Sequence, residues 1–367
     1  MAGSSFGTIF RITTWGESHG PAVGVTVDGC PAGIELSEEL IQPFMDRRKP
    51  GRSRFATKRS ESDTVRILSG VFEGKTTGTP ITMLVQNSDH RSADYSDIAD
   101  CFRPGHADFG FQQKYGFRDY RGGGRSSGRE TAGRVAAGAV ASAFLKELGI
   151  SVLAYTRSIG PVEMEIFDPE EIFRNELYMP DAEKAAEAAR YLEECMKNGD
   201  SSGGVIECVV KGLKPGIGEP VFDKLDACLG KALFSIGAVK GVEIGDGFAA
   251  ARSTGSFNND AFTTDSEGNI ITATNHAGGI LGGISSGNDI IIRAAVKPTP
   301  SISVPQRTVN TRGEEVGLTI RGRHDPVIVP RAVVVAESMA AVTLADAILM
   351  NLGSRMENVR KIWDLMP

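Results

Sequence analysis

Four short stretches rich in Gly, Arg and His hold the residue types that could do chemistry in this chain. They are Gly-Glu-Ser-His-Gly at 16–20, Arg-Pro-Gly-His-Ala-Asp at 103–108, Gly-Gly-Gly-Arg-Ser-Ser-Gly-Arg at 122–129 and Arg-Gly-Arg-His-Asp-Pro at 321–326. Each places proton carriers or anion-binding donors beside glycines, where the backbone can approach a ligand closely. Three of the five histidines lie in these stretches. This concentration predicts one active site assembled from distant parts of the chain.

The three histidines are candidates for acid–base chemistry, because imidazole is the side chain most easily set near neutral pH. His19 follows Ser18, His106 lies two residues before Asp108, and His324 precedes Asp325. A lone histidine is often only a polar side chain with a local partner, and we read His90 as such a surface residue. His276, within Asn-His-Ala-Gly-Gly at 275–279, is a weaker candidate for lining the site.

The third stretch predicts an anion site at a helix start. Ser127-Gly128-Arg129-Glu130 has the Ser-x-x-Glu pattern of a capping box, and a strong apolar periodicity follows it to Leu148. A helix start offers free N–H donors and partial positive charge, which suit phosphate-like groups. Arg125 and Arg129 would add full charge and forked donors.

The basic residues are unevenly distributed in a chain whose net charge is −6. An acidic chain argues against a nucleic-acid binder, although an RNA-binding protein stays an alternative that predicts strongly salt-dependent binding. A basic cleft in an acidic body suits a small, multiply anionic substrate. The densest run comprises Arg47, Arg48, Lys49, Arg52, Arg54, Lys58, Arg59 and Arg66.

Three familiar-looking motifs fail on their context. Gly16-x-Ser18-x-Gly20 matches the nucleophile elbow of serine hydrolases, but the elbow must lead from a strand into a helix, and Pro21 with the following Val/Gly-rich stretch predicts a second strand. A hydrolase using Ser18 therefore stays only an alternative. Residues 70–76 have one residue too few for a nucleotide-binding loop and predict a turn between strands. Residues 199–204 predict a helix end and a turn.

The elements that must position these residues are mixed α and β. The patterns predict strands at 9–14, 23–27, 79–85, 205–210, 242–244, 290–295 and 332–335, and helices starting at Ser37 and spanning 127–148, 181–196, 222–233 and 344–352. Pro43 is expected to end or kink the first helix. Helices and strands do not alternate regularly, so a doubly wound parallel sheet is disfavoured. Without a linker or repeat, residues 1–367 are expected to form one domain.

Length and composition are those of a globular protein. The chain has 367 residues, and we expect no apolar run to approach the roughly 20 residues of a membrane helix. The N-terminus lacks a secretory signal pattern. Five scattered cysteines without a Cys-x-x-Cys pair predict reduced thiols in a cytoplasmic protein and no structural metal site.

Taken together, the motifs resemble the chorismate synthase family nearly from end to end. Besides the stretches above, the resemblance rests on Arg-Arg-Lys-Pro-Gly at 47–51, Ser-Gly-Val-Phe-Glu-Gly at 69–74, Asp-Tyr-Arg-Gly-Gly-Gly-Arg-Ser-Ser at 119–127, Asn-His-Ala-Gly-Gly-Ile-Leu-Gly-Gly-Ile-Ser-Ser-Gly at 275–287 and Lys-Pro-Thr-Pro-Ser at 297–301. It implies an α+β fold, a single-domain α/β sandwich with helices packed between antiparallel sheets.

The resemblance also implies an activity. The substrate would be 5-enolpyruvylshikimate 3-phosphate, a small molecule that loses its C3 phosphate and a C6 proton in an anti-1,4-elimination to give chorismate, the last step of the shikimate pathway. Reduced FMN would be required without net redox change, and NADPH would be a possible reductant. The assembly would be a homotetramer, with no nucleic acid or membrane as partner.

The resemblance assigns roles residue by residue. His19 corresponds to the acid that protonates the departing phosphate, with Ser18 beside it. His106 corresponds to the residue that handles the flavin proton, Asp325 to a residue that orients or relays that proton, and Ser127 to a hydroxyl near flavin and substrate.

Binding residues are implied in the same way. Arg48, Arg54, Arg103 and Arg129 correspond to substrate-binding positions, and Arg48 and Arg54 also to positions assigned to a reduced nicotinamide. Gly237 stands where some relatives carry Asn, so only a backbone contact could persist there. The FMN-contacting set corresponds to Arg125, Ser126, Ser127, Gly237, Ala238, Gly282, Lys297, Pro298, Thr299, Pro300, Ser301 and Arg323.

Overall fold

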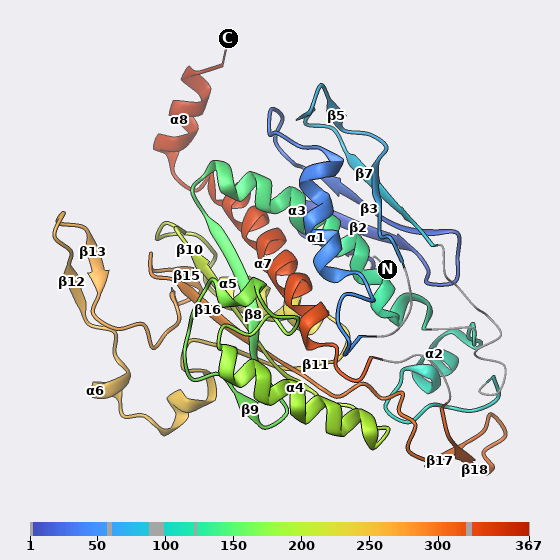
Figure 1. The fold of residues 1–367 in the computed structure, drawn as a ribbon. Helices are drawn as coiled ribbons and strands as arrows, with labels where there is room; N and C mark the ends of the chain where they lie inside the picture. The colour runs from blue at the N-terminus through green and yellow to red at the C-terminus, as the bar shows by residue number, and fades with distance from the viewer. Residues whose placement is uncertain (1–2, 57–60, 88–98, 121–122, 321–324, 367) are drawn as a thin grey trace.

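Two antiparallel sheets of five strands enclose a layer of helices in the computed structural model (Figure 1), which describes residues 3–56, 61–87, 99–120, 123–320 and 325–366. The first sheet has the order β1 (Ser5–Phe6), β2 (Arg11–Gly16), β3 (Ala22–Asp28), β7 (Ile81–Gln86) and β4 (Val65–Ile67). The second has the order β11 (Val239–Ile244), β16 (Ile290–Val296), β10 (Gly204–Lys211), β8 (Ser151–Ile159) and β9 (Val162–Glu163). The expected sandwich of helices between antiparallel sheets is confirmed.

Two helices form the centre of the sandwich. α3 (Thr131–Glu147) packs on the first sheet, α7 (Val329–Asn351) packs on β8 and β10, and the two helices pack on each other. At Gly138 a Cβ atom would lie 2.1 Å from the Cβ of Ser338, so glycine is required for this close approach. α1 (Glu38–Arg48) and α5 (Leu225–Phe234) flank this pair. One cluster of buried apolar side chains extends from Phe10 to Ile348, as the expected single domain would require.

Most predicted elements are present, with three corrections. Residues 332–335, predicted as a strand, lie in α7, because complete burial between α3 and a sheet outweighs the strand preference of the Val-rich run. Pro43 lies inside α1, where its missing N–H affects only the Glu39 carbonyl in the exposed first turn. The helix predicted from Ser127 begins at Thr131, after two three-residue 3₁₀ turns.

α7 contains a longer apolar run than the sequence analysis expected anywhere in the chain. It is 23 residues long and apolar enough to cross a membrane by length and composition. However, 78% of its apolar window is buried inside the structure, which identifies it as a core helix.

Smaller elements surround the sandwich. Four hairpins pair β5 (Val71–Phe72) with β6 (Lys75–Thr76), β12 (Phe262–Thr264) with β13 (Ile270–Thr272), β14 (Ile280–Leu281) with β15 (Ile284–Ser285), and β17 (Gln306–Val309) with β18 (Glu315–Leu318). The predicted turn at 70–76 is the first of these. α4 (Ala182–Lys197), predicted at 181–196, borders the second sheet, and the Asp181 side chain caps it by accepting from the Lys184 N–H.

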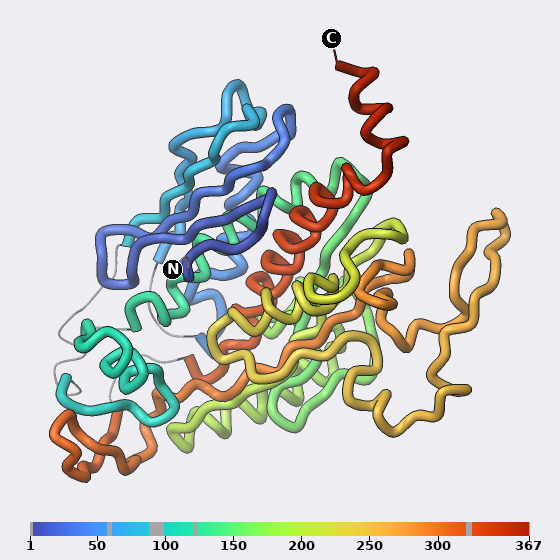
Figure 2. The backbone as a smooth tube through the Cα atoms, turned by 180° about the vertical axis from the view of Figure 1, so that it is seen from behind, coloured from blue at the N-terminus to red at the C-terminus, as the bar shows by residue number. Residues whose placement is uncertain are grey.

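Three segments lie at the edges of the sandwich in both views (Figures 1 and 2). α2 (Asp108–Tyr115) lies beside the β17–β18 hairpin, and the backbone N–H of Phe102 donates to the Val309 carbonyl (3.1 Å). An arm containing α6 (Gly255–Asn258) and the β12–β13 hairpin projects on another side. α8 (Met356–Asp364) extends away from the body at the C-terminus.

Candidate active site

Ser18 and His19 lie in the tight connection between β2 and β3. Its backbone closes with a hydrogen bond from Gly20 N–H to the Glu17 carbonyl (3.1 Å), and the Ser18 Oγ lies 3.0 Å from His19 Nδ1. The connection leads from strand to strand, so the strand-to-helix elbow of a serine hydrolase is not formed at Ser18. His19 is therefore the group in this turn best suited to move a proton.

Asn87 connects this turn to Arg129. Its side-chain amide donates to the carbonyls of Glu17 (2.9 Å) and Gly20 (2.7 Å), while its Oδ1 accepts from Arg129 Nε (2.8 Å). Arg129 Nη2 also donates to the Gln86 carbonyl (2.9 Å) at the end of β7. The first and third sequence stretches are thus joined through a residue that the sequence analysis did not select.

Asp63 links Arg129 to Arg48. One carboxylate oxygen accepts from Arg48 Nε (3.0 Å) and Nη2, and the other accepts from Arg129 Nη1. Burial alone would raise the pKa of Asp63, but the two guanidiniums outweigh it and hold that pKa below its usual value. Arg48 is only 1% exposed and also donates to the Gly128 carbonyl (3.2 Å). The structure therefore buries Arg48, expected to bind substrate, against protein atoms.

The predicted capping box is only half formed. The Ser127 Oγ accepts from the Arg129 N–H (3.2 Å), but this caps a 3₁₀ turn of three residues. The Glu130 carboxylate instead accepts from Thr14 Oγ1 and Arg134 Nε, both at 2.8 Å. The α-helix therefore begins at Thr131 without the expected capping box, and an anion site beside Ser127 stays a prediction.

The two residues before Ser127 are also bound locally. Arg125 donates to the Gly16 carbonyl (2.9 Å) and to Thr14 Oγ1 (2.6 Å), which places its guanidinium at the end of β2. The Ser126 Oγ donates to the Gly123 carbonyl (2.6 Å). The 123–129 segment thus packs directly against the strand that leads to His19.

His106 is held by two neighbours of its own loop. Its Nδ1 lies 2.7 Å from Asp108 Oδ1 and 3.1 Å from Arg103 Nη2, and Arg103 Nε and Nη2 each donate to Asp108 at 2.7 Å. Burial raises the pKa of Asp108, but hydrogen bonds from Arg103 and His106 hold it far below its usual value. An ionised carboxylate can only accept, so Nδ1 carries a proton and Nε2 is the ring nitrogen left for chemistry.

The His106 loop contacts the residues expected to bind FMN. Lys297 Nζ donates to the Gly105 carbonyl (3.1 Å), and Lys297 N–H donates to the Ala238 carbonyl (2.9 Å). Ala238 has a φ of +71°, a conformation that side chains rarely adopt, and such strain often marks a functional site. The Ser201 Oγ donates to the Thr299 carbonyl (2.7 Å), whereas the Thr299 Oγ1 is buried and has no hydrogen-bond partner among the described residues. Pro298, Pro300 and Ser301 belong to the same loop.

Gly282 lies elsewhere in the chain. It is in the turn between β14 and β15, and the carbonyl of the next residue, Gly283, accepts from Leu225 N–H at the start of α5 (2.9 Å). Ala238 follows the other end of α5, a helix of ten residues or about 15 Å. Gly282 therefore lies away from Ala238 within one chain, and its expected contact with FMN stays a prediction.

The fourth stretch is described only from Asp325 onward; Arg323 and His324 lie outside the described residues. Asp325 Oδ2 accepts from Arg331 Nη1 (2.5 Å), and Arg331 Nε donates to the Arg48 carbonyl (3.0 Å). The next residue, Pro326, accepts from Ser202 N–H (2.8 Å). Asp325 thus lies between the Arg48 group and the loop that contains Ser201.

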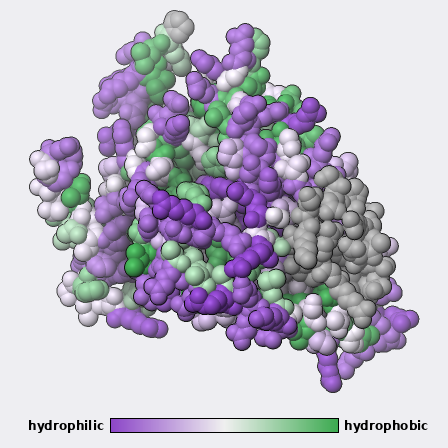
Figure 3. Space-filling view, viewed as in Figure 1, coloured by the Kyte–Doolittle hydropathy of each residue, from purple (hydrophilic) through white to green (hydrophobic). Residues whose placement is uncertain are grey.

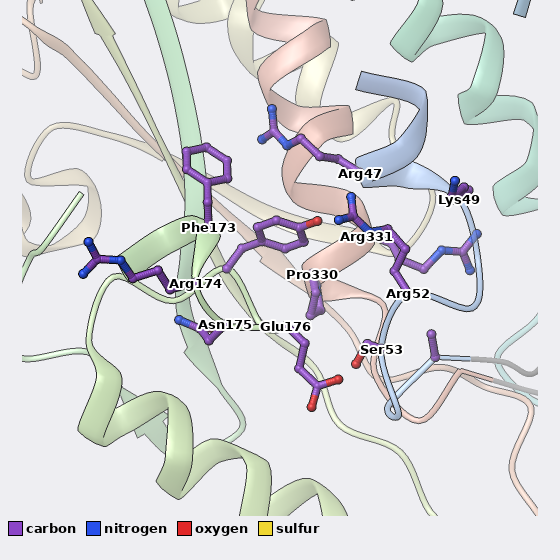
Figure 4. Close-up of a pocket in the computed structure, with 12 residues that line it drawn as sticks. Arg47, Lys49, Arg52, Ser53, Phe173, Arg174, Asn175, Glu176, Pro330 and Arg331 are labelled. Carbon is purple, nitrogen blue, oxygen red and sulfur yellow. The ribbon is translucent and has the colours of Figure 1, made fainter. Parts of the chain in front are cut away.

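Arg54 is far more accessible than Arg48, Arg103 and Arg129, the other arginines expected to bind substrate. Its side chain is 59% exposed and forms ion pairs with Glu176 and Glu193, both at 2.9 Å. Nearby is a cavity of about 310 Å³, which Figure 4 shows between the end of α1, the start of α7 and the segment 173–178. Arg47, Lys49, Arg52 and Arg331 line it from the α1 and α7 side, and the Arg174 side chain extends away to the opposite side.

Arg47 has a structural role. Its Nη1 and Nη2 donate to both oxygens of the buried Glu337 on α7 (2.7 and 2.9 Å). In the described part of the basic run at 47–66, Arg47 and Arg48 are paired with buried carboxylates. Lys49 and Arg52 line the cavity and Arg54 is exposed beside it, so these three are more accessible to a ligand than Arg48.

The described contacts form two neighbouring groups. The first joins the His19 turn, Asn87, Arg129, Asp63 and Arg48; the second joins Arg103, His106 and Asp108 to the loop at 297–301. Asp63, Asn87 and Arg331 were missed from the sequence, because single polar residues outside Gly-rich stretches carry no spacing signal. Within the described ranges, no cluster of three or more His, Cys, Asp or Glu could hold a metal ion.

Comparisons with known proteins agree on one family. The chorismate synthase family model matches residues 10–349. The chain is 63% identical to the chorismate synthase of Lachnoclostridium phytofermentans over 99% of its length and all of that protein, and 63% identical to that of Agathobacter rectalis over 98% of each chain. A crystal structure of chorismate synthase superimposes with a TM-score of 0.74 at 33% identity, covering 98% of this chain and 97% of that one.

Proposed function

The chain belongs to the chorismate synthase family of shikimate-pathway lyases (EC 4.2.3.5), and we propose that it converts 5-enolpyruvylshikimate 3-phosphate to chorismate and phosphate with reduced FMN bound. The observation that supports this most is the pairing of a histidine with an arginine in each contact group. Asn87 joins Arg129 to the turn of His19, and Arg103 lies 3.1 Å from His106. Each pair offers a proton carrier beside a fixed positive charge.

The elimination needs both functions. The C3–O bond breaks with its electron pair leaving on phosphate, the C6–H bond supplies the pair for the new double bond, and one proton leaves the ring. Positive charge stabilises the departing dianion, and a nearby acid can protonate it. We assign this acid to His19, whose Nδ1 lies 3.0 Å from the Ser18 Oγ. Arg129 is the guanidinium connected to that turn.

His106 is assigned to the second proton. Asp108 fixes the Nδ1–H tautomer, so Nε2 of the neutral ring is an acceptor. Asp325, held by Arg331, is assigned a weaker role as a relay or an orienting group. Ser127 is assigned to binding, because its hydroxyl already caps the Arg129 turn.

The loop around Lys297 has features that fit a flavin. In the part of the chain that the structure describes, Thr299 Oγ1 is a buried hydroxyl without a partner, and a Cβ added at Gly237 would meet no atom within 4 Å. Ala238 has a strained backbone. A buried unsatisfied hydroxyl costs free energy unless a ligand satisfies it. Arg125, Ser126 and Lys297 to Ser301 would hold the FMN; when bound in its reduced form, the flavin supplies electron density and proton exchange to the elimination. Gly282 would reach that site only with help from another chain.

A nicotinamide site is less well supported. Arg48 and Arg54 do not present two accessible guanidiniums, since Arg48 is buried in its pair with Asp63. We propose an external reductant for the flavin. Rapid FMN reduction by NADPH with this protein alone, measured anaerobically by absorbance, would contradict that.

Assembly as a homotetramer in the cytoplasm completes the proposal. Free cysteines at all five positions are compatible with a reducing compartment. Apolar side chains exposed on α8, visible in Figure 3 below the C-terminal residue, suit contact with another chain: Met356, Val359, Ile362 and Trp363. Sedimentation velocity of the full chain measures the assembly, and a monomer at micromolar concentration would refute it.

The decisive test is anaerobic phosphate release from 5-enolpyruvylshikimate 3-phosphate, with and without dithionite-reduced FMN. We expect release and chorismate absorbance only with reduced FMN. Release without flavin, or none under either condition, would refute the proposed reaction.

A further inference from the structure

We propose that Asp63 is a positioning residue, which fixes the Arg48 and Arg129 guanidiniums and, through Arg129 and Asn87, the turn that presents His19. This inference rests on the proposed function of these residues. Asp63 lies in the segment just before β4, outside all four of the Gly-rich stretches.

The contacts of Asp63 orient both arginines. Each of its carboxylate oxygens accepts from a different guanidinium, and the whole residue is 0% exposed. Charge-assisted hydrogen bonds of this kind constrain planes as well as distances. One carboxylate therefore sets the separation of two cations that come from α1 and from the 3₁₀ turn before α3.

The arginines would repel each other without this carboxylate. The charges of Arg129 and Arg331 both act against the charged form of Arg48. Arg331 is fixed nearby through the Arg48 carbonyl. Asp63 is the carboxylate that Arg48 and Arg129 share, and it stabilises their close approach. Glu61, 3.5 Å from Arg129 Nη2, is a second carboxylate on Arg129 but has no such contact with Arg48.

The orientation extends from Arg129 to His19. With Nη1 fixed by Asp63, the Nε of Arg129 meets Asn87 at 2.8 Å, and Asn87 holds both carbonyls at the base of the His19 turn. Movement of Arg129 would therefore move the turn. Direct substrate contact by Asp63 itself is disfavoured, because a buried carboxylate repels a substrate that carries a phosphate and two carboxylates.

The backbone at Asp63 makes a clean substitution possible. Its φ is +49°, in the left-handed region that Asn and Asp tolerate better than other side chains. Asp63→Asn therefore keeps the shape and the backbone conformation while removing the charge. Glu207→Gln is the matched control: this buried carboxylate also lies between two arginines, Arg157 (2.9 Å) and Arg293 (2.6 Å), but on the second sheet.

The experiment compares steady-state constants of wild type and both variants with reduced FMN, together with calorimetric substrate binding. We expect Asp63→Asn to raise KM and the substrate Kd by roughly ten- to a hundred-fold with a smaller loss of kcat, as for removal of an ionic anchor. Glu207→Gln should keep wild-type KM even if its melting temperature falls equally.

Two outcomes would overturn the role of Asp63: unchanged KM and Kd in Asp63→Asn, or an equal rise in both variants. Should the wild type bind substrate without turning it over, the proposed reaction would fail, whereas the Kd comparison would still decide the role of Asp63. Asn87→Ala gives a second readout, with an expected larger effect on kcat than on Kd because it releases His19.

Discussion

His106 Nδ1 lies 2.7 Å from Asp108 Oδ1, and the same carboxylate accepts hydrogen bonds from Arg103 Nε and Nη2. Asp108 is 4% exposed, so one buried carboxylate fixes both the tautomer of the histidine and the position of the arginine. His106 and Arg103 were selected from the sequence for separate reasons, and the structure makes them one unit through Asp108.

Asp108→Asn should lower kcat about ten- to a hundred-fold, because an amide can donate as well as accept and no longer enforces the Nδ1–H tautomer. Circular dichroism should show an unchanged fold. Wild-type kcat in a folded variant would contradict the assigned role of Nε2.

Asp108 should also contribute to stability against acid. Its folded-state pKa is depressed, so its stabilisation is present above the unfolded-state pKa of about 4 and is lost as pH falls toward the folded value. Chemical denaturation between pH 3 and 7 should therefore show a shallower loss of stability below about pH 4 in Asp108→Asn than in wild type. If the free energy of unfolding fell equally with pH in both proteins, the contacts of Asp108 with Arg103 and His106 would have little effect on stability.

His19→Ala and His106→Ala should each reduce turnover by roughly a hundred- to ten-thousand-fold, the range for a lost proton carrier. His276→Ala is the control, since His276 is held by Asp260 at 3.0 Å beside Phe257 in the projecting arm. Activity near the wild-type rate in both site variants would refute the assignments, as would an equal loss in His276→Ala.

The sequence predicted the parts of the fold that depend on local pattern. Strands β3, β10 and β16 and helix α4 show clear alternation, periodicity or capping, and all are present. The strand predicted at 332–335 failed because four consecutive β-branched or small apolar residues fit a buried helix as well as a strand. Only the packing of α7 on α3, set by Gly138 and Ser338, decides between the two.

The site could be predicted as residue types but not as partners. Glycine-rich stretches identified His19, His106 and Arg129, because loops that approach ligands need unusual backbone freedom. Asp63 and Asn87 were missed, since their importance arises from burial beside residues distant in sequence. Arg48 illustrates the same limit: the resemblance implied a substrate contact, which stays a prediction, but the burial of its guanidinium beside Asp63 could not be inferred from the basic run.

Thr299→Val should separate cofactor binding from folding. The Thr299 Oγ1 is buried without a partner, so replacing the hydroxyl by a methyl group of similar shape should leave the stability of the flavin-free protein unchanged or slightly higher. If this hydroxyl bonds the flavin, FMN affinity should fall roughly five- to thirty-fold, as for a lost hydrogen bond. Fluorescence titration of FMN against both proteins measures this, with Ser303→Ala as a control outside the predicted set. Equal affinities would remove Thr299 from the flavin site.

Gly138→Ala should test the central helix contact. The added Cβ would lie 2.1 Å from the Ser338 Cβ and 2.5 Å from its Cα, so α3 and α7 must separate or distort. Overpacking of this kind costs about 1–3 kcal/mol, more than the gain in helix propensity. Gly110→Ala in α2 is the matched control, because its Cβ would meet nothing within 4 Å and should add about 0.5–1 kcal/mol of stability. Urea unfolding of both variants measures the two effects. A Gly138→Ala protein as stable as Gly110→Ala would mean that the two helices are not packed as closely as the sandwich requires.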